Sequence, residues 1–250
     1  MSVLPTFQYE VDMIFTKQHI VGSTQVGADA KLSTLGIFGI VESGITEGMA
    51  AQHIDGLTIR RLYNAFWVFT KNQVKIFGSA NWGDVLTVES FVSTVSAAKL
   101  DVDTAIKNAN GQLIAYSCCE MCPLDAATGR IVRTSAVVID ERIVIEPAKI
   151  KVTFGKLDCD DLPVVEEVKV RSTNIDLCQH TNNVEYLRFI FNTYTVEELT
   201  SRPIKEVEIN YVNQSYENEV LSVHKKSMEQ CDLFAITKCG STVIKCKIVR

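Results

Sequence analysis

Residues Val170–Tyr186 read VRSTNIDLCQHTNNVEY. This stretch places an acid (Asp176), a thiol (Cys178) and a histidine (His180) within a few positions, together with several amide side chains. Apolar residues at helical spacing follow at once and predict a helix over Asn183–Thr200. We therefore expect an active site where this loop meets the helix, and we expect most of the remaining chain to shape a cavity around it.

The segments on either side of this junction have the composition of strands. Val164–Arg171 precedes the loop, and further segments rich in β-branched residues follow the helix. These later segments are Ile204–Val212, Val220–Met228, Leu233–Cys239 and Val243–Val249, with a hairpin turn predicted at Gly240-Ser241. The second half of the chain is thus predicted to be one strand, one helix and an antiparallel sheet.

The first half repeats this order of elements without visible sequence identity. Phe7–Phe15 partly alternates apolar and polar residues, which predicts a strand. Leu32–Ile54 is apolar on nearly every face, which predicts a buried helix, and we expect its four glycines to let a sheet approach closely. Strand patterns follow at Ala65–Phe77, Val85–Ala97, Leu100–Lys107, Gln112–Met121 and Ile131–Ile139.

Residues 141–163 interrupt both patterns with two prolines, scattered lysines and the acidic run Asp158–Asp161. We interpret residues 141–163 as a linker between an N-terminal domain (1–140) and a C-terminal domain (164–250). The repeated order predicts an α+β fold of two similar units in tandem, related by a pseudo-twofold axis. We expect their sheets to join and their helices to lie inside.

Composition limits the classes of protein that the chain can belong to. Of its 250 residues, 46% are hydrophobic and 22% are charged, which is typical of a globular protein. The net charge of −5 argues against a nucleic-acid partner. No apolar run reaches the ~20 residues of a membrane span, and Met1–Pro5 lacks the features of a signal peptide. We expect a cytoplasmic protein with no membrane span.

The eight cysteines are expected to be reduced thiols in that compartment. Cys118, Cys119 and Cys122 lie in a strand-like apolar run without a nearby histidine, so we interpret them as buried hydrophobic residues rather than zinc ligands. The sequence assigns no metal and no cofactor.

The polar loop resembles the signature of the acyl–acyl-carrier-protein (acyl-ACP) thioesterase family, Asp-x-Asp-x-Asn-x-His-Val-Asn-Asn-x-x-Tyr. The matching run is Asn174–Tyr186, and Asn64–Lys71, Trp82–Ser90 and Asp125–Gly129 are also similar to the family. The resemblance implies a tandem double hotdog, in which each long antiparallel sheet wraps around a central helix. It also implies hydrolysis of fatty-acyl thioesters on acyl carrier protein, which releases free fatty acid in fatty acid biosynthesis.

Three positions depart from the family pattern. The family asparagine between the acid and the histidine is Cys178 here, and a second family motif, with glutamate before cysteine, is Gln214-Ser215. Asp176 and His180 match the family. The resemblance therefore implies a catalytic set that lies at Asp176, Cys178, His180, Gln214 and Ser215.

The chemistry of these side chains suggests roles for them. His180 is the one residue of the cluster whose unperturbed pKa lies near neutrality, which favours it as general base. Asp176 can orient the imidazole or hold the attacking water. Cys178 as a nucleophile, with His180 as its base, is a less favoured alternative. Gln214 can orient water but cannot accept its proton.

Asn182 and Asn183 mark the predicted start of the helix. Asn182 followed three residues later by Glu185 is typical of an N-cap with a capping-box partner. Free N–H groups at a helix start make a natural oxyanion site, so both asparagines are candidate substrate-binding residues. The alternative is that Asn182 only caps the helix.

By analogy with the family, the first domain shapes the acyl-chain pocket and the second carries the chemistry. The candidate pocket residues are Leu32, Leu35, Phe38, Ile40, Val41 and Trp67, with simple core packing as the alternative role. An acyl carrier protein is acidic, so we expect basic side chains to dock it. The candidates are Lys149, Lys151, Lys156, Arg171 and Arg188.

Other functions stay open at this point. Acyl-CoA carries the same pantetheine arm and is an alternative substrate. A non-catalytic acyl-binding hotdog protein is a second alternative, because three expected site positions are replaced. A hotdog dehydratase is less favoured, because the first helix offers no acid–histidine pair. A monomer and a homodimer are both compatible with a fused pair of domains.

Overall fold

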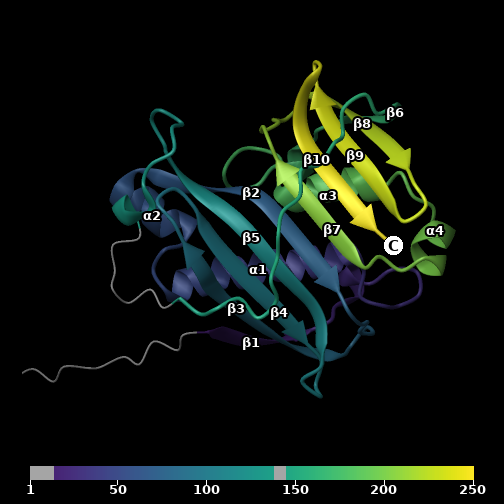
Figure 1. The fold of residues 1–250 in the computed structure, drawn as a ribbon, viewed down its shortest axis with the longest axis horizontal. Helices are drawn as coiled ribbons and strands as arrows, with labels where there is room; N and C mark the ends of the chain where they lie inside the picture. Colours follow the sequence, from purple (N-terminus) through teal and green to yellow (C-terminus); the bar gives the residue numbers. More distant parts are fainter. Residues whose placement is uncertain (1–13, 138–144) are drawn as a thin grey trace, which may run out of the picture.

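The computed structural model describes residues 14–137 and 145–250, and within them the strands form one antiparallel sheet (Figure 1). The strands of the first half are β1 (Phe15–Ile20), β2 (Ala65–Ile76), β3 (Val85–Val95), β4 (Leu100–Lys107) and β5 (Leu113–Asp125). Those of the second half are β6 (Val164–Lys169), β7 (Glu206–Tyr211), β8 (Val220–Ser227), β9 (Cys231–Lys238) and β10 (Ser241–Val249).

The order of strands across the sheet is the same in both halves when each is followed from its outer edge inward. The full order is β1-β3-β4-β5-β2-β7-β10-β9-β8-β6. The halves meet where β2 pairs with β7, at positions such as Val74 opposite Val207. A twofold operation between β2 and β7 would therefore exchange the halves.

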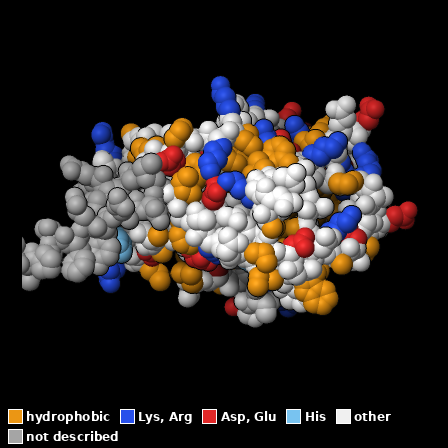
Figure 2. Space-filling view, turned by 90° about the horizontal axis from the view of Figure 1, so that it is seen from below, with side chains coloured by type: hydrophobic (Ala, Val, Ile, Leu, Met, Phe, Trp, Pro, Cys, Tyr) orange, Lys and Arg blue, Asp and Glu red, His pale blue; other side chains and the backbone are white. Residues whose placement is uncertain are grey.

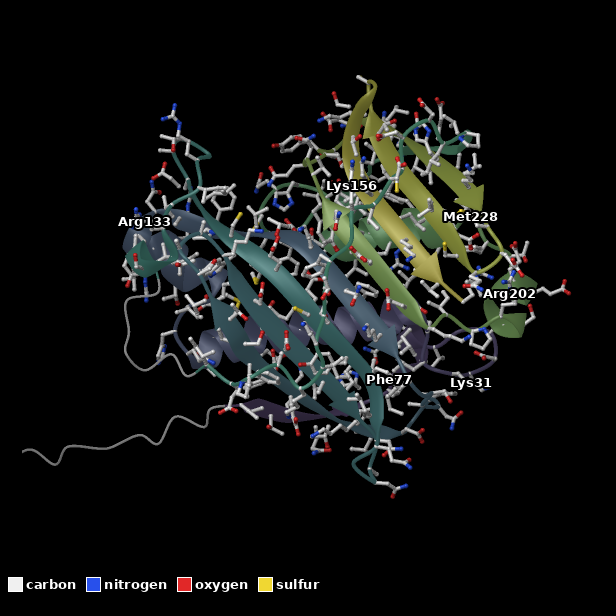
Figure 3. The ribbon with its side chains drawn as sticks, viewed as in Figure 1. Lys31, Phe77, Arg133, Lys156, Arg202 and Met228 are labelled. Carbon is white, nitrogen blue, oxygen red and sulfur yellow. The ribbon has the colours of Figure 1, made fainter. Side chains whose placement is uncertain are left out.

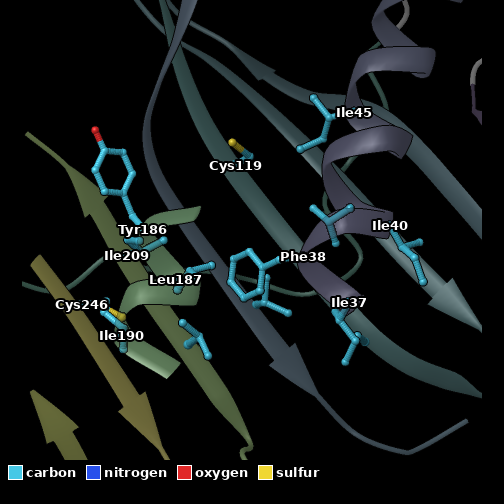
Figure 4. Packing of buried hydrophobic residues seen from close by; sticks show 14 of the residues in the cluster. Ile37, Phe38, Ile40, Ile45, Cys119, Tyr186, Leu187, Ile190, Ile209 and Cys246 are labelled. Atoms are coloured by element: carbon cyan, nitrogen blue, oxygen red, sulfur yellow. The ribbon is translucent and has the colours of Figure 1, made fainter. Parts of the chain in front are cut away.

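Two helices, α1 (Thr34–Ala51) and α3 (Asn183–Phe191), lie on one face of the sheet (Figure 1). Each is followed by a shorter helix, α2 (Gly56–Tyr63) or α4 (Val196–Ser201). The buried side chains of α1 and α3 belong to one hydrophobic core that spans both halves. In Figure 4, Phe38 of α1 faces Leu187 of α3 across the space between the helices.

The predicted buried helix is confirmed, with its glycines acting in two ways. A Cβ atom at Gly44 would lie 3.1 Å from the Val88 side chain, and one at Gly48 would lie 3.3 Å from Ser90, so both permit close contact with β3. Gly36 instead lies against the carbonyl oxygen of Gln25, and Gly39 has open space around it. The expectation that all four face the sheet was wrong for these two.

The predicted helix over Asn183–Thr200 was wrong in its length, because the chain turns after Phe191. Thr195 then starts α4 with a capping box, in which its hydroxyl accepts from the Glu198 N–H and the Glu198 carboxylate accepts from the Thr195 N–H. Helix α2 was not predicted from the sequence. Asp55 caps that helix, and Asn64 ends it in a left-handed conformation.

Two strand predictions need correction. The predicted strand Phe7–Phe15 lies outside the described residues except at its end, and the strand observed there is Phe15–Ile20. In the described part of Ile131–Ile139, the structure has a single bridge residue, Ile131, and the 3-10 turn Thr134–Ala136. Strand β5 already pairs with β4 on one side and β2 on the other, so residues 131–137 cannot join the sheet beside β5.

Residues 145–163 contain neither helix nor strand and cross the outer face of the sheet (Figure 1). Leu157, Cys159 and Leu162 pack there against Ala235 of β9. The assignment of residues 141–163 as a linker stays a prediction.

All eight cysteines are free thiols, and Cys118, Cys119 and Cys122 are buried as predicted. Basic, acidic and hydrophobic side chains are interspersed on the face shown in Figure 2. Among the described residues, every helix is too short or too polar to cross a membrane.

Candidate active site

The polar loop before α3 is a tight turn closed by its own backbone. The N–H of Asp176 donates to the carbonyl of His180 at 3.0 Å, and the N–H of Gln179 donates to the carbonyl of Asp176 at 3.0 Å. Gln179 adopts a left-handed conformation, with φ of 70°. This turn brings the side chains of Asp176, Cys178 and His180 to one place.

Asp176 and His180 face one another across the turn. His180 Nδ1 lies 3.7 Å from Asp176 Oδ2, which is an electrostatic contact but too long for a hydrogen bond. The same nitrogen lies 3.3 Å from the carbonyl oxygen of Thr181. Both contacts involve Nδ1, so Nε2 is the nitrogen left for a substrate or a water.

The Cys178 thiol is exposed next to this pair. Loss of hydration raises its pKa, the negative charge of Asp176 raises it further, and the positive charge of Arg60 opposes both. The Asp176 carboxylate also accepts the Cys178 backbone N–H at 2.8 Å. A thiol with a raised pKa is mostly protonated near neutrality and is therefore a poor nucleophile.

The ligand atoms of Asp176, Cys178 and His180 lie within 4.8 Å of one another. An oxygen, a sulfur and an imidazole nitrogen form a donor set suited to a transition metal such as Zn²⁺, with a fourth position left open. No metal site was predicted here from the sequence.

Ser215 and Gln214 lie in the turn after β7. Ser215 is fully buried, and its hydroxyl lies 2.7 Å from that of Thr181 and 2.9 Å from that of Tyr186. Its carbonyl also accepts the Thr181 N–H at 2.9 Å. Ser215 thus ties the polar loop to the sheet and has the geometry of a positioning residue. The Gln214 side-chain oxygen accepts from the hydroxyl of Tyr216.

Asn182 is the N-cap of α3 as predicted, because its side-chain oxygen accepts the Val184 N–H at 2.8 Å. The expected capping-box role of Glu185 was wrong. Its carboxylate instead accepts from the Asn174 amide at 2.8 Å and from Arg188 at 2.9 Å. The Asn182 amide points the other way and donates to a carboxylate of α1.

That carboxylate is Glu42, which the sequence analysis missed. The Asn182 amide nitrogen lies 3.2 Å from Glu42 Oε1, across 140 positions of sequence. Burial raises the pKa of Glu42, the hydrogen bond from Asn182 lowers it, and the charge of Asp176 raises it. The signal available in the sequence was an acid in a helix that is apolar on nearly every face.

Residues 159–247 match the family model described as the acyl-ACP thioesterase C-terminal domain. The chain is also similar in sequence to curated acyl-ACP thioesterases. It is 23% identical over 188 residues to oleoyl-acyl carrier protein thioesterase 2 of Arabidopsis thaliana, covering 70% of this chain and 50% of that protein. It is 22% identical over 244 residues to the palmitoyl-acyl carrier protein thioesterase of the same plant, covering 91% and 58%.

The chain spans roughly half to two thirds of the length of these curated relatives. Its fold is that of solved acyl-ACP thioesterases. The enzyme of Bacteroides thetaiotaomicron superposes with a TM-score of 0.86 at 18% identity, covering 95% of this chain and 97% of that one. The 12:0-ACP thioesterase of Umbellularia californica gives a TM-score of 0.81 at 16% identity, with the same coverage. The large antiparallel sheet and hotdog fold expected from the family resemblance are confirmed.

The pocket residues suggested by analogy with the acyl-ACP thioesterases all belong to the main hydrophobic core or pack against it. Leu32 and Leu35 line a cavity whose wall contains none of the predicted catalytic residues. Phe38, Ile40 and Val41 are buried in the core. Trp67 donates its indole N–H to the Ile54 carbonyl at 2.7 Å. Their role in acyl binding stays a prediction, as do the catalytic roles expected from the thioesterase motif.

The unpredicted helix α2 adds a further feature to the site. Its Arg60 is close enough to Cys178 to lower the pKa of that thiol. Leu57 and Leu62 of the same helix are 70% and 57% exposed. Helix α2 therefore carries exposed leucines together with an arginine whose charge reaches the polar loop.

Proposed function

We propose that this chain hydrolyses fatty-acyl thioesters, with acyl-ACP as its substrate, and that it is a tandem double hotdog. In this proposal the second unit, residues 164–250, carries the catalytic loop and the first unit carries the acyl-chain pocket. One observation carries the proposal. Asp176 and His180 face one another just before α3, and both lie in the segment that matches the acyl-ACP thioesterase C-terminal domain.

Water activation falls to His180. Its Nδ1 side faces Asp176 and the Thr181 carbonyl, so Nε2 takes the proton from the attacking water. The nearby negative charge of Asp176 stabilises the imidazolium that forms. The proton then passes from Nε2 to the departing thiolate, whose conjugate acid has a pKa near ~8.5.

Glu42 supplies a second carboxyl group to this site. Gln214 can bind a water but cannot take its proton, whereas a glutamate carboxylate can do both, and burial raises the pKa of Glu42, which makes it a stronger proton acceptor. The hydrogen bond from Asn182 holds Glu42 toward the start of α3. We assign Glu42 to positioning the attacking water.

The backbone N–H of Asn183 is the natural donor for the carbonyl oxygen as it becomes negative. The two N–H groups that follow it donate to Asn182, to its side chain from Val184 and to its carbonyl from Glu185. Within the described part of the chain, the Asn183 N–H has no such acceptor, as expected for the first residue of a helix. The partial positive charge of the helix start adds to its effect.

We place docking of the carrier protein on α2 rather than at Lys149, one of the five basic residues suggested by the sequence. Lys149 is paired with Glu89 at 2.6 Å and lies over the Phe91 ring. By contrast, Arg60 and Arg61 lie on α2 beside two exposed leucines, and Arg60 acts on the catalytic loop. An acidic carrier with an apolar contact patch fits this combination.

The decisive experiment measures thiol release from acyl-ACP and acyl-CoA thioesters of several chain lengths. The wild-type chain is expected to release thiol from acyl-ACP, and His180→Ala and Asp176→Ala are expected to lose most of this activity. Faster release from acyl-CoA would identify CoA as the carrier. Tight acyl binding without turnover above the two variants would overturn the proposal in favour of a non-catalytic acyl-binding protein.

A further inference from the structure

The first half of the chain contains a second loop with the backbone of the catalytic loop. In the loop before α1, residues 25–33, the Gly27 N–H donates to the Lys31 carbonyl at 2.8 Å. This bond is the counterpart of the one from Asp176 to His180, at 3.0 Å. A bridge between Val26 and Leu32 closes it, as a bridge between Ile175 and Thr181 closes the catalytic loop.

The correspondence continues along both loops. Ala30 and Gln179, three positions after the start of each turn, both adopt a left-handed conformation, with φ of 59° and 70°. Ser33 caps α1 by accepting the Gly36 N–H, as Asn182 caps α3. These shared features set the register residue by residue.

The same register extends to the sheet. The Leu32 N–H donates to the carbonyl of Ala80 at 2.8 Å, as the Thr181 N–H donates to that of Ser215 at 2.9 Å. The loop before α1 therefore lies against the end of β2 as the catalytic loop lies against the end of β7.

This register gives a first-half counterpart for each catalytic position. Gly27 stands where the catalytic loop has Asp176, Asp29 stands for Cys178, and Lys31 stands for His180. A lysine ammonium cannot take a proton from water at neutral pH. The counterpart site therefore lacks a general base and carries a fixed positive charge in its place.

A cavity of about 520 Å³ lies at this counterpart site. Residues of both halves line it, and its apolar wall is formed by Leu35, Ile37, Ile76, Phe191, Leu199 and Ile204. Its polar lining includes the two lysines Lys31 and Lys205. Figure 3 shows Lys31 near Phe77, another lining residue at the same end of the sheet.

The two lysines are available to a ligand. Neither Lys31 nor Lys205 forms a salt bridge with a carboxylate in the ranges 14–137 and 145–250. The one acidic lining residue, Asp29, accepts the Lys31 backbone N–H at 3.2 Å and so is held within its own loop. An apolar wall with uncompensated ammonium groups suits an amphipathic anion.

We propose that this cavity is a non-catalytic second site that binds a fatty acid as its carboxylate anion. The acyl tail lies against the apolar wall, and the carboxylate lies by Lys31 and Lys205. The site differs from the catalytic one in binding the free acid rather than a thioester. Its ligand is the product of the proposed reaction, so binding at this site would allow the product to regulate the enzyme.

The test is calorimetric titration of the intact chain with dodecanoate, and with dodecanol as an uncharged probe of the same length. Lys31→Glu is expected to weaken dodecanoate binding at this site about tenfold or more, with little effect on dodecanol. Leu199→Trp, which fills the cavity, is expected to remove the binding of both probes at this site, so that the total stoichiometry falls by one. Lys226→Glu, at an exposed lysine of β8, is the matched charge control and should change neither.

A thermal unfolding curve for each variant shows whether it is folded. His180→Ala is expected to leave dodecanoate binding at this cavity intact, so the result does not depend on whether the catalytic proposal holds. Dodecanoate binding whose stoichiometry and affinity are the same in wild type, Lys31→Glu and Leu199→Trp, all folded, would overturn the second site. Equal weakening by Lys226→Glu would also overturn it, because the effect would then come from general charge.

Discussion

The Asn182 amide at the start of α3 donates to the Glu42 carboxylate in the middle of α1, at 3.2 Å. This bond joins the two halves at the catalytic loop. It holds a carboxyl group with a raised pKa close to Asp176, in a site whose family glutamate position is Gln214.

Glu42→Gln is expected to lower kcat about 10²-fold, because the water loses its carboxylate while the bond to Asn182 can persist. The same change should stabilise the fold at high pH. Because the folded-state pKa of Glu42 is raised, ionising it costs folding free energy once the pH exceeds its unfolded value near ~4.3. Wild type should therefore lose stability relative to Glu42→Gln as the pH rises from there through the folded pKa.

Urea unfolding at pH 4 and pH 8, with steady-state kinetics at pH 8, checks both effects. Glu47→Gln is the control, since Glu47 lies on the same helix but pairs with Lys17. A kcat unchanged by Glu42→Gln would remove Glu42 from the mechanism.

The catalytic pair could be predicted because it is local. Asp176 and His180 are four positions apart, and a tight turn is enough to bring them together. Glu42 could not be found in this way, because it reaches the loop only after the two halves have packed with α1 beside α3. The sequence does show an acid at Glu42 within a largely apolar helix, but this position alone does not indicate which loop the side chain will face.

The errors in secondary structure have a related cause. Ile131–Ile139 has the composition of a strand, yet β2 and β4 already occupy both sides of β5, where it would pair. Helix α2 was missed because its eight residues are too few for a helical pattern to stand out from the flanking sequence. Its signals were its caps, Asp55 and Asn64. Strand composition and helix periodicity report local preference, whereas these outcomes depend on which positions in the sheet and core are free.

His180→Ala is expected to lower kcat about 10²- to 10⁴-fold, because the general base is lost. Asp176→Asn should have a smaller effect of the same kind, since it removes the charge that stabilises the imidazolium but keeps the bond to the Cys178 N–H. Single-turnover kinetics with acyl-ACP measure the chemical step directly. His53→Asn, at an exposed histidine with φ of 58°, is the control, because asparagine tolerates that conformation. Equal activity in His180→Ala and His53→Asn would refute the role of His180.

Cys178→Ser is expected to retain at least about half of wild-type kcat, because the raised pKa keeps the thiol protonated and out of the chemistry. Alkylation with iodoacetamide near neutral pH should also be slow at Cys178. The rate at each cysteine can be followed by peptide mass spectrometry, with the exposed Cys239 as the reference thiol. Loss of turnover in a folded Cys178→Ser variant would instead support a thiolate nucleophile.

Zn²⁺ is expected to inhibit the enzyme reversibly by binding Asp176, Cys178 and His180, whose ligand atoms lie within 4.8 Å of one another. Chelation with EDTA should restore activity. Cys178→Ser should weaken the inhibition about tenfold or more, because it removes the thiolate ligand while leaving the proposed base in place. Titration of activity with zinc checks this, and Cys239→Ser is the matched control. Inhibition that is equally strong in Cys178→Ser would place the zinc elsewhere.

Reversing the charge of Arg60 and Arg61 together is expected to raise KM for acyl-ACP about tenfold and to leave kcat nearly unchanged, because docking precedes the chemistry. The wild-type KM should rise with added salt, and the variant should show a weaker salt dependence, since fewer charge pairs remain to be screened. The KM for an acyl-CoA substrate should change less, because CoA has no protein surface to contact the exposed Leu57 and Leu62. Lys149→Glu tests the surface first suggested by the sequence. An effect of Lys149→Glu larger than that of the α2 variant would move the docking site from α2 to the outer face of the sheet.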